Sequence, residues 1–539
     1  MARPARKTMS PAELKSHCGR ADKAWADKSA SKWLYDEAYQ WAIPYRRPAK
    51  YNQGSRVDNI FDKTAIASTF HGAGTLKEDL FPSGQPFFKL ETTAVGKAGV
   101  KARGIDPVVF NRVLGNIADQ VIPFFQTGEF DQATTEMCID LYAGTAILIP
   151  MRGDDDNPVR FVTPPADECA LGLGAFSDTV FLTWRTKLTR RAIKAQWPKG
   201  VYSREFEEQL AGDGADREID ICQDFWQDGK VWRFAAYLRD GGADNDNVPI
   251  VTESYRTKPF AAPRYHRVPG ETYGRGPILL AMPAIKTVNK AQELTLKSAA
   301  IQMLGIWGYR PGGTFNPDTA RIAPGAWWAM SSTGGVMGPD VQRMDTGTGN
   351  VQIGQLISQD LRQRIQVILN DDRLPDKSGS TPISASEVVA RMAKVKANYI
   401  GAFGRLINEI IPVIVPRVME ILYDAHLLDT DLRPNQLFVQ TKATSPMAEA
   451  MKINHLQPLM QILQLIEALQ MDPNRFFKID DLIDQIIADL NIEAKFRRTA
   501  AERADVDKAN AQAKAQQAVQ EALTKKPEIV ADALQQQAA

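Results

Sequence analysis

The 539-residue chain has few cysteines and histidines, no long hydrophobic run and almost no net charge. Its four cysteines, Cys18, Cys138, Cys169 and Cys222, are scattered without CxxC spacing. We therefore expect reduced, mostly buried thiols rather than a zinc cluster or a disulfide framework. The five histidines are far apart in the sequence, which disfavours a histidine-based catalytic or metal site. These shortages predict a protein without a metal ion or another cofactor.

The sequence also lacks a segment suited to a membrane. No apolar run approaches the roughly 20 residues of a membrane-spanning helix, and the best candidate, residues 410–416, is short and contains two prolines. The N-terminus is basic but has no apolar stretch typical of a signal peptide. We expect a soluble protein that is made in a cytoplasm and has no membrane partner.

The charges are balanced, with 65 Lys and Arg against 64 Asp and Glu. This balance argues against a protein that coats nucleic acid or binds membranes through a polybasic surface. It is uneven along the chain, because residues 274–306 hold four basic residues against Glu293 alone. Any contact with a polyanion must therefore come from local clusters.

The motifs of the common enzyme classes are missing as well. No Walker loop, GxGxxG after a strand, GxSxG elbow or HExxH occurs, so we expect no enzymatic activity. The carboxylate run at residues 154–157 could bind a cation but is more typical of an exposed turn. One alternative is a soluble enzyme with its catalytic core at residues 147–268. Such an enzyme would need a cleft lined by convergent polar side chains.

The chain does contain the patterns of a mixed α+β fold dominated by helices. Apolar spacing predicts helices at residues 11–42, 59–80 and 106–146, with a short strand at 87–90. Six short β-branched or aromatic segments separated by turn residues then predict an antiparallel sheet. These segments are residues 146–150, 159–162, 180–184, 219–222, 231–235 and 249–252.

Long helices follow. Pro277 stands at a first helical position and predicts a helix over residues 278–303. A segment rich in Gly, Pro and Trp separates it from a second helix at residues 351–369. Residues 371–381 are polar and turn-prone.

A third long helix begins at Ser384, which can form a capping box with Glu387. It extends to about residue 428, with kinks expected at Pro412 and Pro416. The remaining pattern predicts a strand at residues 436–440, helices at 451–471, 479–490 and 494–524, and a low-complexity tail at 525–539.

A basic stripe on the first long helix is a candidate for function. Lys286, Lys290 and Lys297 fall within about 40° of one another at 100° per residue. Glu293 lies on the same stripe, so ordinary Lys–Glu pairs on a solvated face are the alternative interpretation.

The turn-rich segment between the first two long helices contains adjacent tryptophans, Trp327 and Trp328. Held between two helices, these aromatic side chains are candidates for docking. The alternative is an ordinary hairpin whose tryptophans are buried in a neighbouring part of the fold.

Several stretches together resemble the portal, or head-to-tail connector, proteins of short-tailed double-stranded DNA phages. They occur in the family's order, and the resemblance spans about residues 10–430. After residue 450 the similarity is limited to helical character and a bias to Ala and Gln. The resembling stretches are FHGAGTLKEDLFPSG at 70–84, FFKL at 87–90, YGRGP at 273–277, SEVVARM at 386–392 and GRLINE at 404–409.

The resemblance implies a portal-type fold with long stem helices and kinked wing helices, an antiparallel β-rich portion of the wing and a C-terminal helical crown. Its parts would be a helical and β-rich wing at 1–273, a first stem helix at 274–306, a clip at 307–349, a second stem helix at 350–371, a channel loop at 372–383, a long kinked helix and wing return at 384–449, and crown helices with a tail at 450–539.

The resemblance also implies a function in the virion. The chain would form a ring of twelve subunits at one capsid vertex, between head and tail, and conduct double-stranded DNA during packaging and ejection. Contact with DNA would be transient and independent of sequence. The implied protein partners are the terminase large subunit, the major capsid and scaffolding proteins, the tail adaptor and tail proteins, and internal core proteins at the crown.

Another virion structural protein, a tail adaptor or a scaffold, is a second alternative. Scaffolds are typically more charged and lack a β-rich middle, which argues against that version.

Site residues follow from the same resemblance. A ring repeats each side chain, so one lysine becomes a circle of positive charge around the duplex. A near-neutral protein suits a channel, because each neutralised phosphate would add affinity and slow the DNA. The expected channel residues are Lys377, Lys297, Lys290, Lys286, Arg364 and Arg362, and the expected clip or docking residues are Trp327, Trp328, Arg310 and Arg321.

Overall fold

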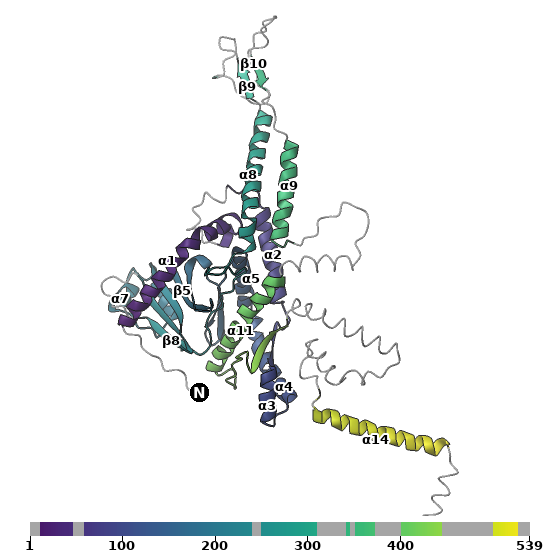
Figure 1. The fold of residues 1–539 in the computed structure, drawn as a ribbon. Helices are drawn as coiled ribbons and strands as arrows, with labels where there is room; N and C mark the ends of the chain where they lie inside the picture. Colours follow the sequence, from purple (N-terminus) through teal and green to yellow (C-terminus); the bar gives the residue numbers. More distant parts are fainter. Residues whose placement is uncertain are drawn as a thin grey trace, which may run out of the picture.

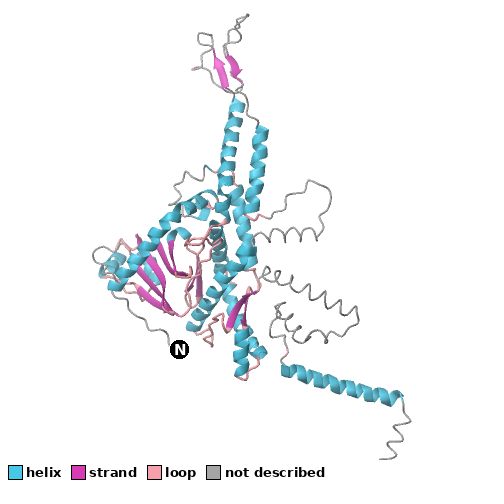
Figure 2. Ribbon diagram, in the orientation of Figure 1, coloured by secondary structure: helices cyan, strands magenta, loops and turns pink. Residues whose placement is uncertain are grey.

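A helical hairpin projects from a body that combines helices with antiparallel sheets (Figure 1). Figure 2 shows that most strands lie in the body. This is a computed structural model, and it describes residues 11–46, 59–239, 249–304, 306–309, 318, 341–344, 351–371, 400–444, 498 and 500–525. The predicted mixed α+β class with antiparallel sheets is confirmed. None of the helices described here is long and apolar enough to cross a membrane.

The N-terminal third is largely helical, as predicted, but the second helix starts later, the third expected helix is divided, and the helix Ala94–Ala102 was not predicted. The second helix begins at Thr64 instead of residue 59, and Asp62, just before it, accepts a hydrogen bond from the Thr64 amide at 2.9 Å. The helix expected at 106–146 is divided, and Thr127 caps its second part. The elements are α1 Pro11–Trp41, η1 Pro44–Arg46, α2 Thr64–Leu80, β1 Phe88–Thr92, α3 Ala94–Ala102, α4 Pro107–Val121, η3 Ile122–Phe125 and α5 Gly128–Ala143.

A five-stranded antiparallel sheet forms one side of the body, in the order β4-β5-β6-β7-β8. The six expected strands are found, but they do not form one sheet: β2 and β3 pair in a separate two-stranded sheet, and β4 in the five-stranded sheet was not predicted. The carboxylate run at 154–157 forms the turn between β2 and β3, as predicted. The bounds are β2 Ile149–Arg152, β3 Val159–Val162, η4 Ala166–Glu168, β4 Cys169–Leu173, β5 Thr179–Thr189, α6 Arg190–Gln196, α7 Arg204–Ala211, β6 Glu218–Asp228, β7 Val231–Leu238 and β8 Val251–Tyr255.

Helix α1 lies across one face of this sheet (Figure 1). Ala21 and Ala24 allow it to approach closely, and they pack against Phe181 and Trp226. Lys28 is buried, and its ammonium donates hydrogen bonds to the carbonyl oxygens of residues 166, 167 and 169 at 2.6, 2.8 and 2.9 Å. Three acceptors compensate the buried charge, so α1 is fixed to the sheet at a defined position.

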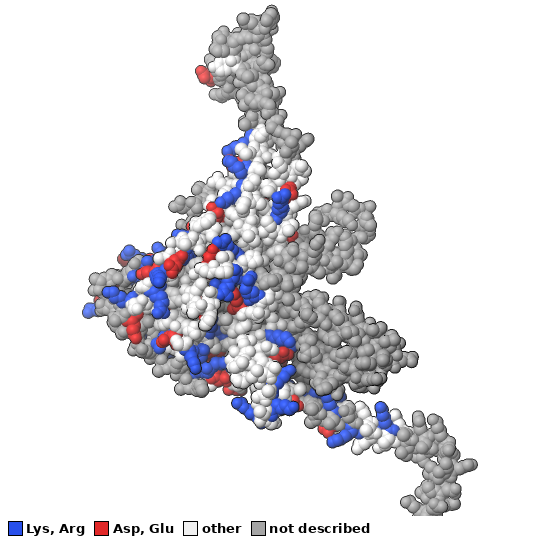
Figure 3. All heavy atoms as spheres, viewed as in Figure 1, with Lys and Arg blue, Asp and Glu red and all other residues white. Residues whose placement is uncertain are grey.

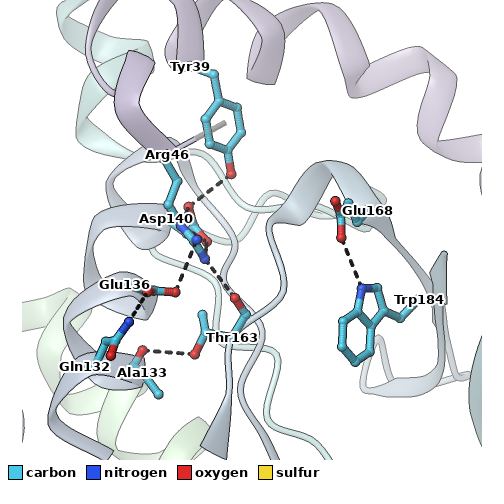
Figure 4. A network of polar contacts seen from close by, with 9 residues as sticks. All are labelled: Tyr39, Arg46, Gln132, Ala133, Glu136, Asp140, Thr163, Glu168 and Trp184. Atoms are coloured by element: carbon cyan, nitrogen blue, oxygen red, sulfur yellow. Dashed lines mark hydrogen bonds and ion pairs between the residues drawn. The ribbon is translucent and has the colours of Figure 1, made fainter. Parts of the chain in front are cut away.

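A buried polar network holds the end of α1 against α5 and β3 (Figure 4). Arg46 donates to Asp140 at 3.0 Å and to the Thr163 carbonyl at 2.8 Å, and it lies 3.2 Å from Glu136. The Tyr39 hydroxyl donates to Asp140 at 3.1 Å. Burial raises the pKa of Asp140 to about 6 despite the Arg46 charge. Because Asp140 is buried, removing Arg46 would leave its carboxylate without a charged partner and would destabilise the fold.

The core is built around α11 Ile400–Asp424, whose apolar residues are buried on most of its circumference. Pro412 and Pro416 lie inside this continuous helix. Next to it, β1 pairs antiparallel with β11 Val439–Ala443, and Leu90 lies opposite Thr441. The strand expected at 436–440 is therefore displaced by three residues, and it brings together segments about 350 residues apart in sequence.

Further along the chain, α14 Ala500–Lys525 confirms most of the helix expected at 494–524. The expected loop and helix start at 372–399, the helices at 451–471 and 479–490, and the tail at 526–539 lie outside the described residues.

The YGRGP sequence forms the joint between the body and the projecting hairpin. A Cβ at Gly276 would overlap the carbonyl of Tyr142, and one at Gly274 would lie 2.6 Å from the oxygen of Gly144. Tyr35 donates to the Gly274 carbonyl at 2.7 Å. Pro277 then opens the outgoing helix, where its missing N–H costs nothing. Glycines are required here because backbones touch.

Gly276→Ala should destabilise the chain, because the new methyl group must displace the backbone of Tyr142. We expect a loss of about 1–3 kcal/mol in the free energy of unfolding, measured by urea denaturation. The control is Gly115→Ala in α4, where a Cβ meets nothing within 4 Å. That change should be neutral or stabilising by up to about 1 kcal/mol. Equal effects at the two positions would contradict the role of the joint.

Candidate functional site

The projecting hairpin is the candidate functional site. Helix α8 Pro277–Leu304 runs outward and α9 Val351–Ile368 returns beside it (Figure 1). At the far end, β9 Ile306–Tyr309 pairs antiparallel with β10 Val341–Met344. Both helices confirm the lengths that their sequence patterns predict. The docking candidates Arg310, Arg321, Trp327 and Trp328, and the channel candidate Lys377, lie outside the described residues.

Arg362 ties the base of the hairpin to α2. Its guanidinium lies 2.7 Å from Asp62, which is 3% exposed, and donates to Gln292 of α8 at 3.2 Å. Burial alone would raise the pKa of Asp62, but hydrogen bonds from Thr64 and Arg362 outweigh it and lower this pKa. Arg362 of α9 therefore joins α8 to the segment that leads into α2, and a DNA phosphate would have to compete with Asp62 for it.

The basic stripe of α8 contains the Lys–Glu pairs that its spacing predicts. Glu293 lies 3.0 Å from Lys290 and 2.6 Å from Lys297, and the hydrogen bonds from Lys297 and Lys290 lower its pKa. Both lysines are well exposed. Lys286 makes a contact that the sequence did not reveal, because it lies 2.7 Å from Glu37 of α1. The stripe is thus anchored at its base and open to solvent further out.

The two arginines of α9, Arg362 and Arg364, cannot both point toward the same axis. They are two positions apart, which corresponds to about 200° around a helix. Arg362 faces Asp62 and α8, whereas Arg364 is exposed and pairs with Asp360 at 2.9 Å. At most one of the two would face a common channel.

Sequence reasoning missed a set of apolar side chains on the outer surfaces of the hairpin. A helical wheel of the two predicted helices could have found most of them, since Leu280, Leu294, Leu356 and Val367 lie on the side opposite the buried positions. In Figure 3 much of the hairpin surface is uncharged, whereas both signs of charge alternate over the body. The exposed residues are Leu280, Leu294 and Leu296 on α8, and Leu356, Ile357 and Val367 on α9.

A cavity of about 250 Å³ lies between the start of α1 and strands β6 to β8. It is lined by His17, Arg20 and Arg233, among others, and Arg233 pairs with Asp228 at 2.7 Å. Within the described ranges no three His, Cys, Asp or Glu side chains are arranged to hold a metal ion. Three of the four cysteines are buried, and all four are free thiols, as expected.

Arg362→Ala should lower the free energy of unfolding by about 1–3 kcal/mol, because it leaves the buried Asp62 carboxylate without its charged partner. Arg364→Ala removes an exposed pair and should cost less than about 1 kcal/mol. The folded-state pKa of Asp62 is lowered, so its contribution is present above pH of about 4 and lost below it. Urea denaturation of wild type and Arg362→Ala should therefore show a difference that shrinks in acid. A difference that persists unchanged below that pH would contradict the pairing.

Comparison with known proteins gives one family. Residues 15–497 match the sequence model of a family described as "Bacteriophage head to tail connecting protein". No curated protein matches the sequence.

Among solved structures, the chain is similar to one from the neck of an empty gene transfer agent particle, at 11% identity and a TM-score of 0.37, covering 78% of this chain and 93% of that one. It is also similar to one from the virion of a native gene transfer agent particle, at 13% identity and a TM-score of 0.28, covering 74% and 94%.

Proposed function

The chain belongs to the family of bacteriophage head to tail connecting proteins, and on this premise we propose that it forms a ring whose axial channel conducts double-stranded DNA. Family membership assigns it a structural role in the virion, at the junction of head and tail. The proposed ring adds the geometry by which a connector can join two structures and still let DNA pass.

One observation carries the ring. The hairpin extends beyond the body with large apolar side chains uncovered in the single chain, and Leu356 and Val367 are 68% and 66% exposed. Exposed apolar side chains repeated along one projecting element indicate a surface for contact with another molecule. In a head-to-tail ring the neighbouring copies provide that cover.

We assign the parts of the chain to a portal architecture on the same basis. The body at 1–273 would be the wing, α8 and α9 the stem, and 307–349 a clip that docks first the terminase and then the tail. Residues 372–383 would form a channel loop, and 384–449 the long kinked helix and the wing return. The helices after 450 would form a crown inside the head.

The proposed partners follow from this placement. A ring of twelve at one capsid vertex would contact the major capsid and scaffolding proteins, and later the tail adaptor and tail proteins. The crown would face internal core proteins. The chain would conduct and dock without catalysing a reaction, and the motor ATPase would be a separate protein. A tail adaptor within the same junction is the alternative.

The channel would touch DNA weakly. Lys290 and Lys297 each share Glu293, so a ring of these side chains carries a small net positive charge on an exposed surface. Weak contacts suit sliding, because each neutralised phosphate adds affinity. Lys286 and Arg362 already pair with Glu37 and Asp62 and rank below Lys377, Lys297 and Lys290 as DNA contacts. The pair with Asp360 places Arg364 below them too.

Negative-stain microscopy of the purified chain tests the ring directly. We expect particles with a central hole and about twelve repeats. A chain that stays monomeric by light scattering at every concentration would overturn the proposed ring.

Lys297→Glu and Lys377→Glu should leave ring assembly intact and lower DNA retention, because each places a circle of negative charge in the channel. Retention is measured as DNA bound to rings over a salt series, and the salt slope should fall. Lys230→Glu, an identical charge change at the exposed β6–β7 turn, is the control and should have no effect. Unchanged retention in Lys297→Glu or Lys377→Glu would remove that residue from the channel.

A further inference from the structure

The two helices of the hairpin present apolar faces on different flanks. On α8, Leu280, Pro283, Thr287 and Leu294 are exposed and fall within about 60° of one another. We call these four residues the α8 stripe. The centre of this stripe lies about 120° around α8 from the side that carries Gln292 and Thr295, two residues that face α9.

The exposed face of α9 consists of Leu356, Ile357, Asp360, Arg364 and Val367, within about 100° of one another. We call these five residues the α9 face. It points away from α8, because Arg362, which does touch α8, lies about 170° around the helix from the centre of the face.

Two contacts fix how the helices are aligned along the hairpin. Arg362 hydrogen-bonds Gln292 at 3.2 Å, and a Cβ at Gly354 would lie 3.8 Å from the Thr295 hydroxyl. The helices are antiparallel, so Ile357 lies at the level of Leu294. In the same alignment Val367, toward the body, lies between the levels of Pro283 and Thr287.

In a ring, the position of a residue along the hairpin determines which residues of the neighbouring copy it can contact. Neighbouring copies are related by rotation about one axis, so an interface joins surfaces at the same height. With the hairpin running along that axis, the α9 face of one copy meets the α8 stripe of the next in matching order. Val367 would oppose Pro283 and Thr287, and Leu356 and Ile357 would oppose Leu294.

Charge complementarity favours the same pairing. Lys290 lies within about one helical turn of the level of Asp360, at the border of the two surfaces. Each is now held by an exposed pair within its own chain, Lys290 with Glu293 and Asp360 with Arg364. Exposed pairs of this kind are weak and can exchange partners at little cost.

We propose that the α9 face of one subunit docks on the α8 stripe of a second copy of this chain and forms the subunit interface of the hairpin. The proposal rests on the proposed ring and adds which surfaces meet. It also assigns Arg364 to the interface rather than to the channel.

Paired cysteines test the contact. Leu294→Cys combined with Ile357→Cys should, on mild oxidation of assembled rings, give a ladder of covalent oligomers on a denaturing gel. The matched control is Leu296→Cys with Ile357→Cys. Leu296 is 49% exposed, close to the 55% of Leu294, but lies about 160° away around α8. Rings that give no ladder with the first pair, or an equal ladder with the control, would overturn the proposal.

Charged substitutions provide a second measurement. Leu294→Glu and Leu356→Glu should each raise the subunit concentration needed for half-maximal assembly at least about tenfold, whereas Leu296→Glu should leave it unchanged. The reverse order, or equal effects, would contradict the interface. If wild type forms rings and these outcomes fail, only the interface is wrong. If wild type forms no ring, the proposed function fails with it.

Discussion

The close approach of two backbones at Gly144, Gly274 and Gly276 is the constraint on which the rest of the structure depends. It places the start of α8 directly against the end of α5, where a side chain would force the two apart. Tyr35 and Tyr273 then bind the joint to α1 and to the strand β4. The direction of the hairpin is therefore set by the body, and every surface on the hairpin inherits its position from that joint.

Charged residues near the joint link the base of the hairpin to the body. Lys286 pairs with α1 and Arg362 with the start of α2, so two helices of the body brace the base of α8 and α9 from different directions. Farther out on α8, Lys290 and Lys297 pair with an acidic residue of their own helix on an exposed face, as Arg364 does on α9. The hairpin thus changes along its length from a packed part of one chain to a surface suited to contact with other molecules.

Much of this could be predicted from the sequence, where the signal is local. The lengths of α8 and α9, the β-rich segment and the Lys290–Glu293–Lys297 pairs follow from periodicity and from spacing along one helix. The pairing of β1 with β11 could not be predicted, because it joins distant segments and its register depends on the core between them. For the same reason the partners of Lys286 and Arg362 were missed, since Glu37 and Asp62 are distant in sequence.

The sequence by itself determined the class of the fold, the presence of two long helices around a turn-rich segment and the likeness to phage connectors. These depend on patterns that repeat within one helix or strand, or on short stretches in a fixed order. Only the tertiary structure decided which basic residues form ion pairs, which apolar residues remain exposed and which positions of α8 and α9 lie side by side. Those facts depend on distances between segments far apart in the chain, which composition and periodicity do not contain.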